Sequence, residues 1–165
     1  MLLVTVIEAD LGRADHQSDV ATLIDAFAID RTGEPLSIQA QQDLMPGLQN
    51  HPTTHIFVAY QGDRAIGIAV CFRGFSTFAA RPLINIHDLL VLPNYRGQGV
   101  GKQLLQAVEH SAREMGCCKL TLEVQEGNHR ARRVYEAAGF EQPEYHDGGK
   151  LLFLAKALQA TNGPC

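Results

Sequence analysis

The sequence predicts an α/β (α+β) fold, in which a mixed, mostly antiparallel sheet is flanked by helices. Short apolar segments that are typical of strands alternate along the chain with longer amphipathic segments that are typical of helices. A basic, glycine-rich segment at residues 96–102 follows a buried strand and leads directly into an amphipathic helix. A strand, a helix and a further strand in this order indicate a right-handed parallel crossover.

The composition is typical of a single globular domain. The chain has 165 residues, of which 45% are hydrophobic, and this is enough to bury a sizeable core. A net charge of -4 argues against a general nucleic-acid binder, which usually carries a basic surplus. No apolar run approaches the ~20 residues of a membrane span. We expect one domain at residues 1–157, a flexible tail at 158–165, and neither a nucleic-acid nor a membrane partner.

The cysteines and histidines do not form recognisable metal or disulfide motifs. The four cysteines, Cys71, Cys117, Cys118 and Cys165, lack both CxxC spacing and a disulfide-rich density, which is typical of a reduced cytoplasmic protein. The seven histidines are scattered, without an HExxH motif or a Cys/His cluster. We therefore expect a cytoplasmic protein with no metal.

The first half of the chain is predicted to form an edge strand, two helices and a hairpin. Apolar residues at helical spacing and Gly or Pro breaks set these limits. The expected elements are a strand at 1–7, a helix capped by Asp19 that runs to Asp30, a helix capped by Ser37 that ends near Gly47, antiparallel strands at 55–60 and 65–72, and a connection at 74–82.

The second half is predicted to alternate strands and helices. The helix that starts at Gly99 has an apolar stripe at i, i+4 spacing and a stop at Gly116. Because this helix separates two strands, those strands should be parallel. The expected elements are strands at 83–92, 119–124 and 150–155, the helix from Gly99 to Gly116, and a helix capped by Asn128 that ends at Gly139.

The segment 96–102 has the features of a phosphate-binding loop. Its three glycines stand at alternate positions, so the backbone can approach a ligand closely. Free N–H groups at the start of the following helix, together with the helix dipole, favour an anion there. Arg96 and Lys102 add positive charge on either side. We therefore expect this loop to bind phosphate.

Two other phosphate-binding loops fit this segment less well. A Walker A loop would need glycine where Arg96 stands and a hydroxyl side chain where Gln103 stands, so nothing would hold magnesium. A dinucleotide fingerprint needs G-x-G-x-x-G, whereas the glycines here fall at alternate positions and no early βαβ unit surrounds them.

Two motifs stand in order in the second half: Arg96-x-x-Gly99-x-Gly101 after a strand, and Asn128-x-x-Ala131-x-x-x-Tyr135-Glu136-x-x-Gly139-Phe140 on a helix. They resemble the two signatures of the GNAT superfamily, the acyl-CoA-dependent N-acetyltransferases. The resemblance covers about residues 55–157, and the N-terminal quarter matches by element order only. It implies the GNAT fold, with a mixed, mostly antiparallel central sheet of six to seven strands, a parallel, splayed central pair, and about four flanking helices.

The resemblance implies acetyl-CoA as the co-substrate, without a metal. The Val91 N–H would polarise the thioester carbonyl, and Tyr135 would protonate the departing thiolate, since a phenol stays protonated at neutral pH. Without the surrounding motif, Tyr135 would be taken for a core aromatic, and Asn128 for a simple helix cap. The implied cofactor-binding residues are Leu89, Leu90, Val91, Arg96, Gly97, Gln98, Gly99, Val100, Gly101, Lys102, Asn128, Ala131 and Tyr135.

The segments 75–78 and 86–91 are similar to the diamine (spermidine/spermine-type) branch of this family, where a Leu-Glu-Asp sequence occupies the second segment. Here His87 takes the place of that Glu, which keeps a titratable group but removes a carboxylate. His87 is therefore a candidate general base, and a structural histidine is the alternative. Strand alternation would put His87 and Asp88 on opposite faces. The candidate acceptor-binding residues are Phe27, Phe75, Phe78 and His87.

These observations predict an N-acetyltransferase that moves an acetyl group from acetyl-CoA to a primary amine of a small molecule, by direct attack in a ternary complex. One alternative is a peptide or protein N-terminal or lysine acetyltransferase. Another is a non-catalytic module that binds acyl-CoA. The resemblance also suggests a homodimer.

Overall fold

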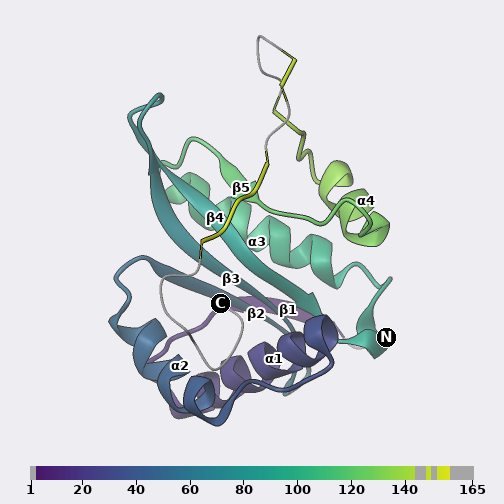
Figure 1. The fold of residues 1–165 in the computed structure, drawn as a ribbon. Helices are drawn as coiled ribbons and strands as arrows, with labels where there is room; N and C mark the ends of the chain where they lie inside the picture. The colour runs from purple at the N-terminus through teal and green to yellow at the C-terminus, as the bar shows by residue number, and fades with distance from the viewer. Residues whose placement is uncertain (1–2, 144–147, 150–151, 157–165) are drawn as a thin grey trace.

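The computed structural model describes residues 3–143, 148–149 and 152–156. Within them, one five-stranded sheet in the order β1-β2-β3-β4-β5 lies between helices (Figure 1). The elements are β1 (Val4–Glu8), α1 (Ala14–Thr32), α2 (Ile38–Asn50), β2 (Thr54–Gln61), β3 (Arg64–Ser76), β4 (Arg81–Val91), the 3-10 turn η1 (Pro93–Tyr95), α3 (Val100–Glu114), β5 (Leu120–Leu122) and α4 (His129–Ala137).

The sheet is antiparallel from β1 to β4, whereas β4 and β5 are parallel. Helix α3 connects β4 to β5, so the predicted parallel crossover is confirmed. The parallel pairing covers only residues 84–86 of β4. Strand β4 continues to Val91 without β5 beside it, and the two strands therefore separate at this end of the sheet.

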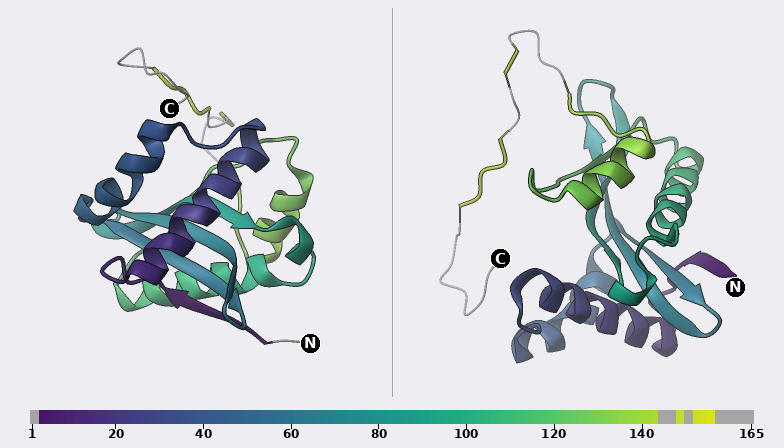
Figure 2. Two further views of the ribbon diagram at one scale, coloured as in Figure 1. Left: turned by 90° about the horizontal axis from the view of Figure 1, so that it is seen from below. Right: turned by 90° about the vertical axis from the view of Figure 1, so that its right-hand side faces the viewer.

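Apolar residues cover both faces of the sheet. Helices α1 and α2 pack on one face, and α3 packs on the other (Figures 1 and 2). Val58, Ile68 and Leu90 belong to the core under α1 and α2, whereas Ile66 and Ile86 belong to the core under α3. Burial on both faces explains why the central strands are apolar at consecutive positions rather than alternate ones.

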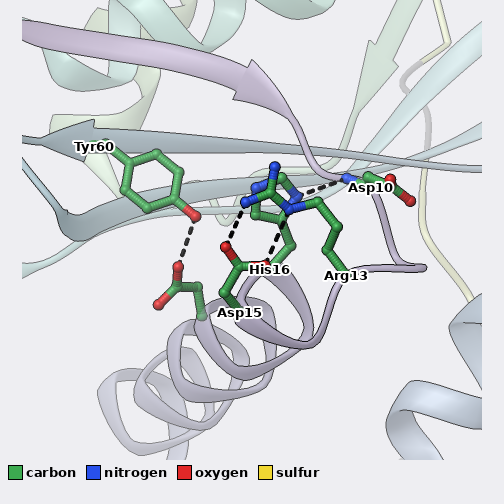
Figure 3. A network of polar contacts seen from close by, with 6 residues as sticks. Asp10, Arg13, Asp15, His16 and Tyr60 are labelled. Atoms are coloured by element: carbon green, nitrogen blue, oxygen red, sulfur yellow. Dashed lines mark hydrogen bonds and ion pairs between the residues drawn. The ribbon is translucent and has the colours of Figure 1, made fainter.

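Helix α1 begins at Ala14, so the prediction that Asp19 caps it is wrong. The Asp19 carboxylate instead accepts a hydrogen bond of 2.7 Å from the Tyr60 hydroxyl (Figure 3). The buried His16 holds the chain before α1 against the first turn of the helix, because its Nδ1 accepts the Asp10 N–H at 3.0 Å. Burial and the Asp19 contact raise the pKa of Tyr60. The bond between Asp19 and Tyr60 links residues far apart in sequence, so a local capping pattern does not reveal it.

Two further element limits differ from the predictions. Helix α2 is capped by Ser37 as expected but continues past Gly47 to Asn50, because Leu48 packs into the core beside α1. The predicted connection at 74–82 is mostly strand, since β3 and β4 form one long hairpin in which Phe75 pairs with Pro82. Cross-strand pairing therefore outweighs the local Gly and Pro signals at these positions.

The described residues contain five strands, so the expectation of six to seven is wrong for this part of the chain. Of the strand predicted at 150–155, residues 150 and 151 lie outside the described residues, and residues 152–155 are irregular. Their apolar side chains are exposed, so they lack a strand partner that would bury one face. The predicted tail at 158–165 lies outside the described residues. The expected number of flanking helices, about four, is confirmed by α1 to α4.

Candidate active site

A cleft of about 1040 Å³ opens where β4 and β5 separate. Its walls come from the C-terminal end of α1, the end of β4, the glycine-rich loop, the segment after β5, and α4. Figure 2 shows the C-terminal end of α1 and α4 on the same side of the molecule. The sequence-predicted residues that line this cleft are Phe27, His87, Leu89, Leu90, Val91, Arg96, Gly97, Gly99, Val100, Gly101, Lys102, Asn128, Ala131 and Tyr135.

One end of the cleft is the start of α3. The N-cap of α3 is Gly99, which has a φ of 82° and no side chain to accept the N–H groups of the first helical turn. A Cβ added at Gly97 or Gly99 would meet no protein atom within 4 Å, so the space beside the loop is open. The Val100 side chain is buried, so this residue offers the cleft only its backbone. This end is suited to an anion such as a diphosphate.

The two long polar side chains of the loop bind protein groups. Arg96 donates from Nε to the Val91 carbonyl at 2.7 Å and from its terminal nitrogen to Asp30 at 2.8 Å. Its guanidinium thus joins the end of β4 to α1. Gln98 donates back to the Asn94 carbonyl at 3.0 Å and does not line the cleft. Besides Arg96, the positive side chains that line the cleft near this loop and on α4 are Lys102, Arg130 and Arg133.

The backbone of β4 presents alternate residues to the cleft. Leu92 donates to the Ile66 carbonyl on β3, so the backbone groups of Val91, one residue earlier, point away from β3. The contact between the Val91 carbonyl and Arg96 agrees with this direction. Leu89 shares the alternation of Val91, whereas the backbone of Leu90 faces β3. Val91 and Leu89 can therefore offer N–H groups to a ligand between the separated strands.

Tyr135 projects from α4 into the other part of the cleft. Its ring packs edge-on against Phe140, with the ring centroids 5.8 Å apart. Burial raises the pKa of Tyr135, and the positive charge of Arg31 opposes part of this effect. The phenol therefore keeps its proton at neutral pH and can act as a donor.

Asn128 marks the start of α4 at the rim of the same cleft. Its Oδ1 accepts the Ala131 N–H at 3.1 Å, which confirms the predicted helix cap. This bond uses the side-chain oxygen of Asn128, whereas its side-chain NH2 group can donate to a ligand, so capping and contact with a ligand are compatible.

His87 and Asp88 both line the cleft. A β-bulge explains this, because Val70 pairs with Asp88 and Cys71 pairs with Ile86, which leaves His87 without a partner opposite it. The prediction that the two side chains lie on opposite faces is therefore wrong. The exposed ring of His87 contacts Phe72 edge-on, with centroids 5.7 Å apart.

Asp88 is a cleft residue to which the sequence pattern assigns no role. Its carboxyl group is half-buried, and burial raises its pKa, while the positive charges of His87 and Arg31 oppose the shift. A carboxylate in a partly desolvated cleft is a strong partner for a cationic group. The signal that could have found it is the bulge, which depends on strand register and is not visible in the sequence.

The aromatic residues predicted to bind the acceptor separate into two groups. Phe27 lines the cleft, whereas Phe75 and Phe78 do not. Both lie toward the turn of the long hairpin, where Phe75 is 62% exposed and Phe78 is fully exposed. Phe75 pairs with Pro82, five residues before His87, which corresponds to roughly 16 Å along the strand. Within one chain, the structure does not bring Phe75 and Phe78 to the cleft.

Neither a membrane-spanning helix nor a metal-binding cluster occurs in the part of the chain that the structure describes. No helix there is both long enough and apolar enough to cross a bilayer. No group of three or more His, Cys, Asp or Glu side chains there is arranged to hold a metal ion. Cys71 is buried in the core, where burial raises its pKa to about 12 and keeps the thiol neutral.

Comparison with known proteins agrees with this geometry. The uncharacterized N-acetyltransferase YhfO of Bacillus subtilis is 32% identical over 103 residues, which are 62% of this chain and 68% of that protein. Thialysine N-epsilon-acetyltransferase of Bos taurus is 37% identical over 104 residues, 62% of this chain and 61% of that protein. The chain thus spans about two thirds or less of the length of these relatives.

A solved structure shares the fold along almost the whole chain. It is the aminoglycoside acetyltransferase meta-AAC0020 from an uncultured soil metagenomic sample, in complex with sisomicin. The TM-score is 0.77 at 18% identity, covering 94% of this chain and 97% of that one. The pattern of the Acetyltransferase (GNAT) family matches residues 21–140, from α1 to the end of the Tyr135 motif. The chain belongs to the GNAT acetyltransferase family.

Proposed function

We propose that this protein transfers an acetyl group from acetyl-CoA to a primary amine of a small molecule in a ternary complex. The observation that carries the proposal is that one cleft joins the open N-terminus of α3 to the half-buried side chains of Tyr135 and Asp88. The first feature suits the diphosphate of a coenzyme. Tyr135 suits the donation of a proton to a leaving group, and the Asp88 carboxylate suits the binding of a cationic acceptor.

The described residues fit acetyl-CoA along the length of the cleft. The open loop at Gly97 and Gly99 would receive the diphosphate, and Lys102 would add charge. The outward backbone groups of Leu89 and Val91 would pair with the amides of the pantetheine arm, as a neighbouring strand would. When bound, acetyl-CoA supplies the acetyl group as a thioester.

Two groups of this chain would act on the thioester. The Val91 N–H would stabilise negative charge on the carbonyl oxygen, and one such donor contributes about 2.7–4 kcal/mol in enzymes that use it. Tyr135 would donate its proton to the sulfur as the amine nitrogen forms the C–N bond and the C–S bond breaks. The raised pKa of Tyr135 keeps this proton in place until it is needed.

Two further groups would act on the amine. An amine reaches the cleft as an ammonium ion, which the half-buried Asp88 carboxylate would attract. His87 lines the same wall and is exposed to solvent, so it can accept the proton that the ammonium loses and pass it to water. The bulge supports this division, because it brings both side chains to the cleft.

The names of two similar proteins support a small-molecule acceptor. The bovine relative is named for acetylation of thialysine, and the soil structure is named for acetylation of aminoglycosides. Both names denote amines of small molecules.

We also propose a homodimer, on the basis of the family resemblance, and a cytoplasmic location, on the basis of the cysteine pattern.

Thiol release from acetyl-CoA, measured over a panel of small amines and lysine-containing peptides, tests this function. We expect turnover with at least one small amine and much slower turnover with peptides. Faster acetylation of the peptides would favour the protein acetyltransferase alternative. Binding of acetyl-CoA without turnover on any acceptor would identify a non-catalytic module.

A further inference from the structure

Arg31 is a positive side chain on the acceptor side of the cleft to which neither the sequence nor the proposed chemistry assigns a role. It lies in the last turn of α1 and lines the cleft together with Phe27, Asp88 and Tyr135. Its guanidinium carbon lies 5.8 Å from the centroid of the Phe27 ring. Stacking of this kind restrains a long side chain and orients its planar donor group.

The neighbouring charges leave Arg31 available to a ligand. Asp30 precedes it in α1 but is bound by Arg96 at 2.8 Å. Within the described ranges, no ion pair joins Arg31 to a carboxylate. Burial raises the pKa values of both Asp88 and Tyr135, and the positive charge of Arg31 opposes this rise in each, so its field reaches the two groups that flank the proposed reaction.

The acceptor side therefore presents one positive and one negative group. Asp88 suits the ammonium of the acceptor, as proposed above. A second ammonium on a diamine would be repelled by Arg31, whereas a carboxylate would find in it a planar donor group of matching geometry.

We propose that Arg31 binds a carboxylate of the acceptor, so that the preferred substrates are amino acids or similar molecules that carry both an amine and a carboxylate. This inference rests on the proposed acetyltransferase function and narrows its acceptor class. It makes Arg31 a specificity-determining residue, because it would contact the part of the acceptor that does not react.

Pairs of acceptors that differ only by a carboxylate test this inference. Lysine and cadaverine form one pair, and ornithine and putrescine form the other. We expect kcat/KM to be about tenfold or more higher for the amino acid of each pair, as one charge-assisted contact would give. Arg31→Gln should remove this preference, mainly by raising KM for the amino acid. Arg31→Lys should restore part of it, and Arg31→Glu should favour the diamine.

Arg113→Gln is the matched control, since Arg113 lies on the exposed face of α3 and pairs with Glu109. It should leave the preference unchanged. Equal kcat/KM values within each pair in the wild-type protein would overturn the inference while leaving the transferase function intact. The inference would also be overturned if Arg31→Gln weakened acetyl-CoA binding, measured by calorimetry, while the preference for the amino acid over the diamine stayed unchanged. Failure to acetylate any amine despite acetyl-CoA binding would overturn the proposed function and, with it, this inference.

Discussion

Tyr135 is the single residue on which the proposed chemistry depends most. We predict that Tyr135→Phe lowers kcat by about 100-fold, within the range that one general acid contributes, because the thiolate would leave without a proton donor. Acetyl-CoA affinity should change little, since the ring and its contact with Phe140 remain. Steady-state kinetics and calorimetry separate the two effects.

Tyr60→Phe is the control for loss of a tyrosine hydroxyl outside the cleft, because Tyr60 bonds Asp19 under α1. It should reduce the free energy of unfolding but leave kcat unchanged. If Tyr135→Phe kept the wild-type kcat, Tyr135 would be a packing residue, as its half-buried position also allows.

Asp88 gives a prediction on stability and pH. Burial raises the pKa of the Asp88 carboxyl in the folded protein, so the charged form is less favourable there than in the unfolded chain. The resulting loss of stability is absent at pH values below the pKa that Asp88 has in the unfolded chain. It appears as the pH rises through the higher pKa that Asp88 has in the folded protein. Asp88→Asn should therefore be more stable than the wild type at pH 7, and this gain should vanish at about pH 3.5, below the ordinary Asp value.

Urea unfolding of both proteins at the two pH values checks this sign. Asp43→Asn is a suitable control, because Asp43 lies on an exposed face of α2 and bonds only Gln39 among the side chains described. A wild type more stable than Asp88→Asn at pH 7 would show that the charges of His87 and Arg31 outweigh the burial of Asp88.

His87 makes a prediction about rate and pH. We expect His87→Gln to lower the rate near neutral pH, where the amine arrives as ammonium and needs a base, and to have less effect at high pH, where more of the amine is already deprotonated. The pH dependence of kcat/KM with one amine measures this. A pH profile of unchanged shape would make His87 a structural residue, held by its ring contact with Phe72.

At the scale of elements, the position of α3 depends on Gly67 in β3. A Cβ at Gly67 would lie 3.0 Å from the Leu90 carbonyl oxygen and 3.2 Å from Cδ1 of Leu104. The Leu90 carbonyl belongs to a paired strand and cannot move aside as a flexible side chain can. We therefore predict that Gly67→Ala lowers the free energy of unfolding by about 1–3 kcal/mol. Gly74→Ala in the same strand should cost less, because its new Cβ would meet only the Leu83 side chain. Equal urea midpoints for the two variants would contradict this explanation.

Elements with local signals were predicted well, and elements fixed by distant contacts were not. The glycine-rich loop, α3 and the Asn128 cap follow from residues that are close in sequence, and all three form as expected. Asp19 lies inside α1 rather than at its cap, and its carboxylate binds the hydroxyl of Tyr60 on another element of the fold. The length of the β3–β4 hairpin depends on pairing between strands, which outweighs its internal glycine.

The candidate site shows the same difference between residues with local sequence signals and residues positioned by distant contacts. The conformation of the glycine-rich loop and the start of α3 was predictable, because both lie within short, contiguous motifs. On the acceptor side, Asp88 enters the cleft through a bulge and Arg31 reaches it from a distant helix. Phe75 and Phe78 were predicted there as aromatic residues that could line an acceptor slot, yet both are exposed near the turn of the hairpin and do not line the cleft. Register and long-range packing decide these positions, and neither is encoded locally.

At the scale of the whole molecule, the cleft exists because α3 and α4 are attached to strands that separate while α1 covers the opposite face of the sheet. Arg96 connects the two sides through Val91 and Asp30. Binding of a coenzyme at the loop can therefore take place beside an acceptor that contacts α1. The proposed attack in a ternary complex requires both substrates to be bound together in this way.

Calorimetric titration of the wild type and of Gly99→Val with acetyl-CoA tests the central claim most directly. Gly62→Val is the matched control, since both glycines have positive φ, 82° and 59°, and open space where a Cβ would stand. Both variants carry a similar backbone strain, roughly 1–2 kcal/mol. We predict that the wild type binds acetyl-CoA, that Gly99→Val weakens binding at least tenfold, and that Gly62→Val does not. Absence of wild-type binding, or equal affinity in both variants, would contradict the claim that the coenzyme's diphosphate lies against this loop.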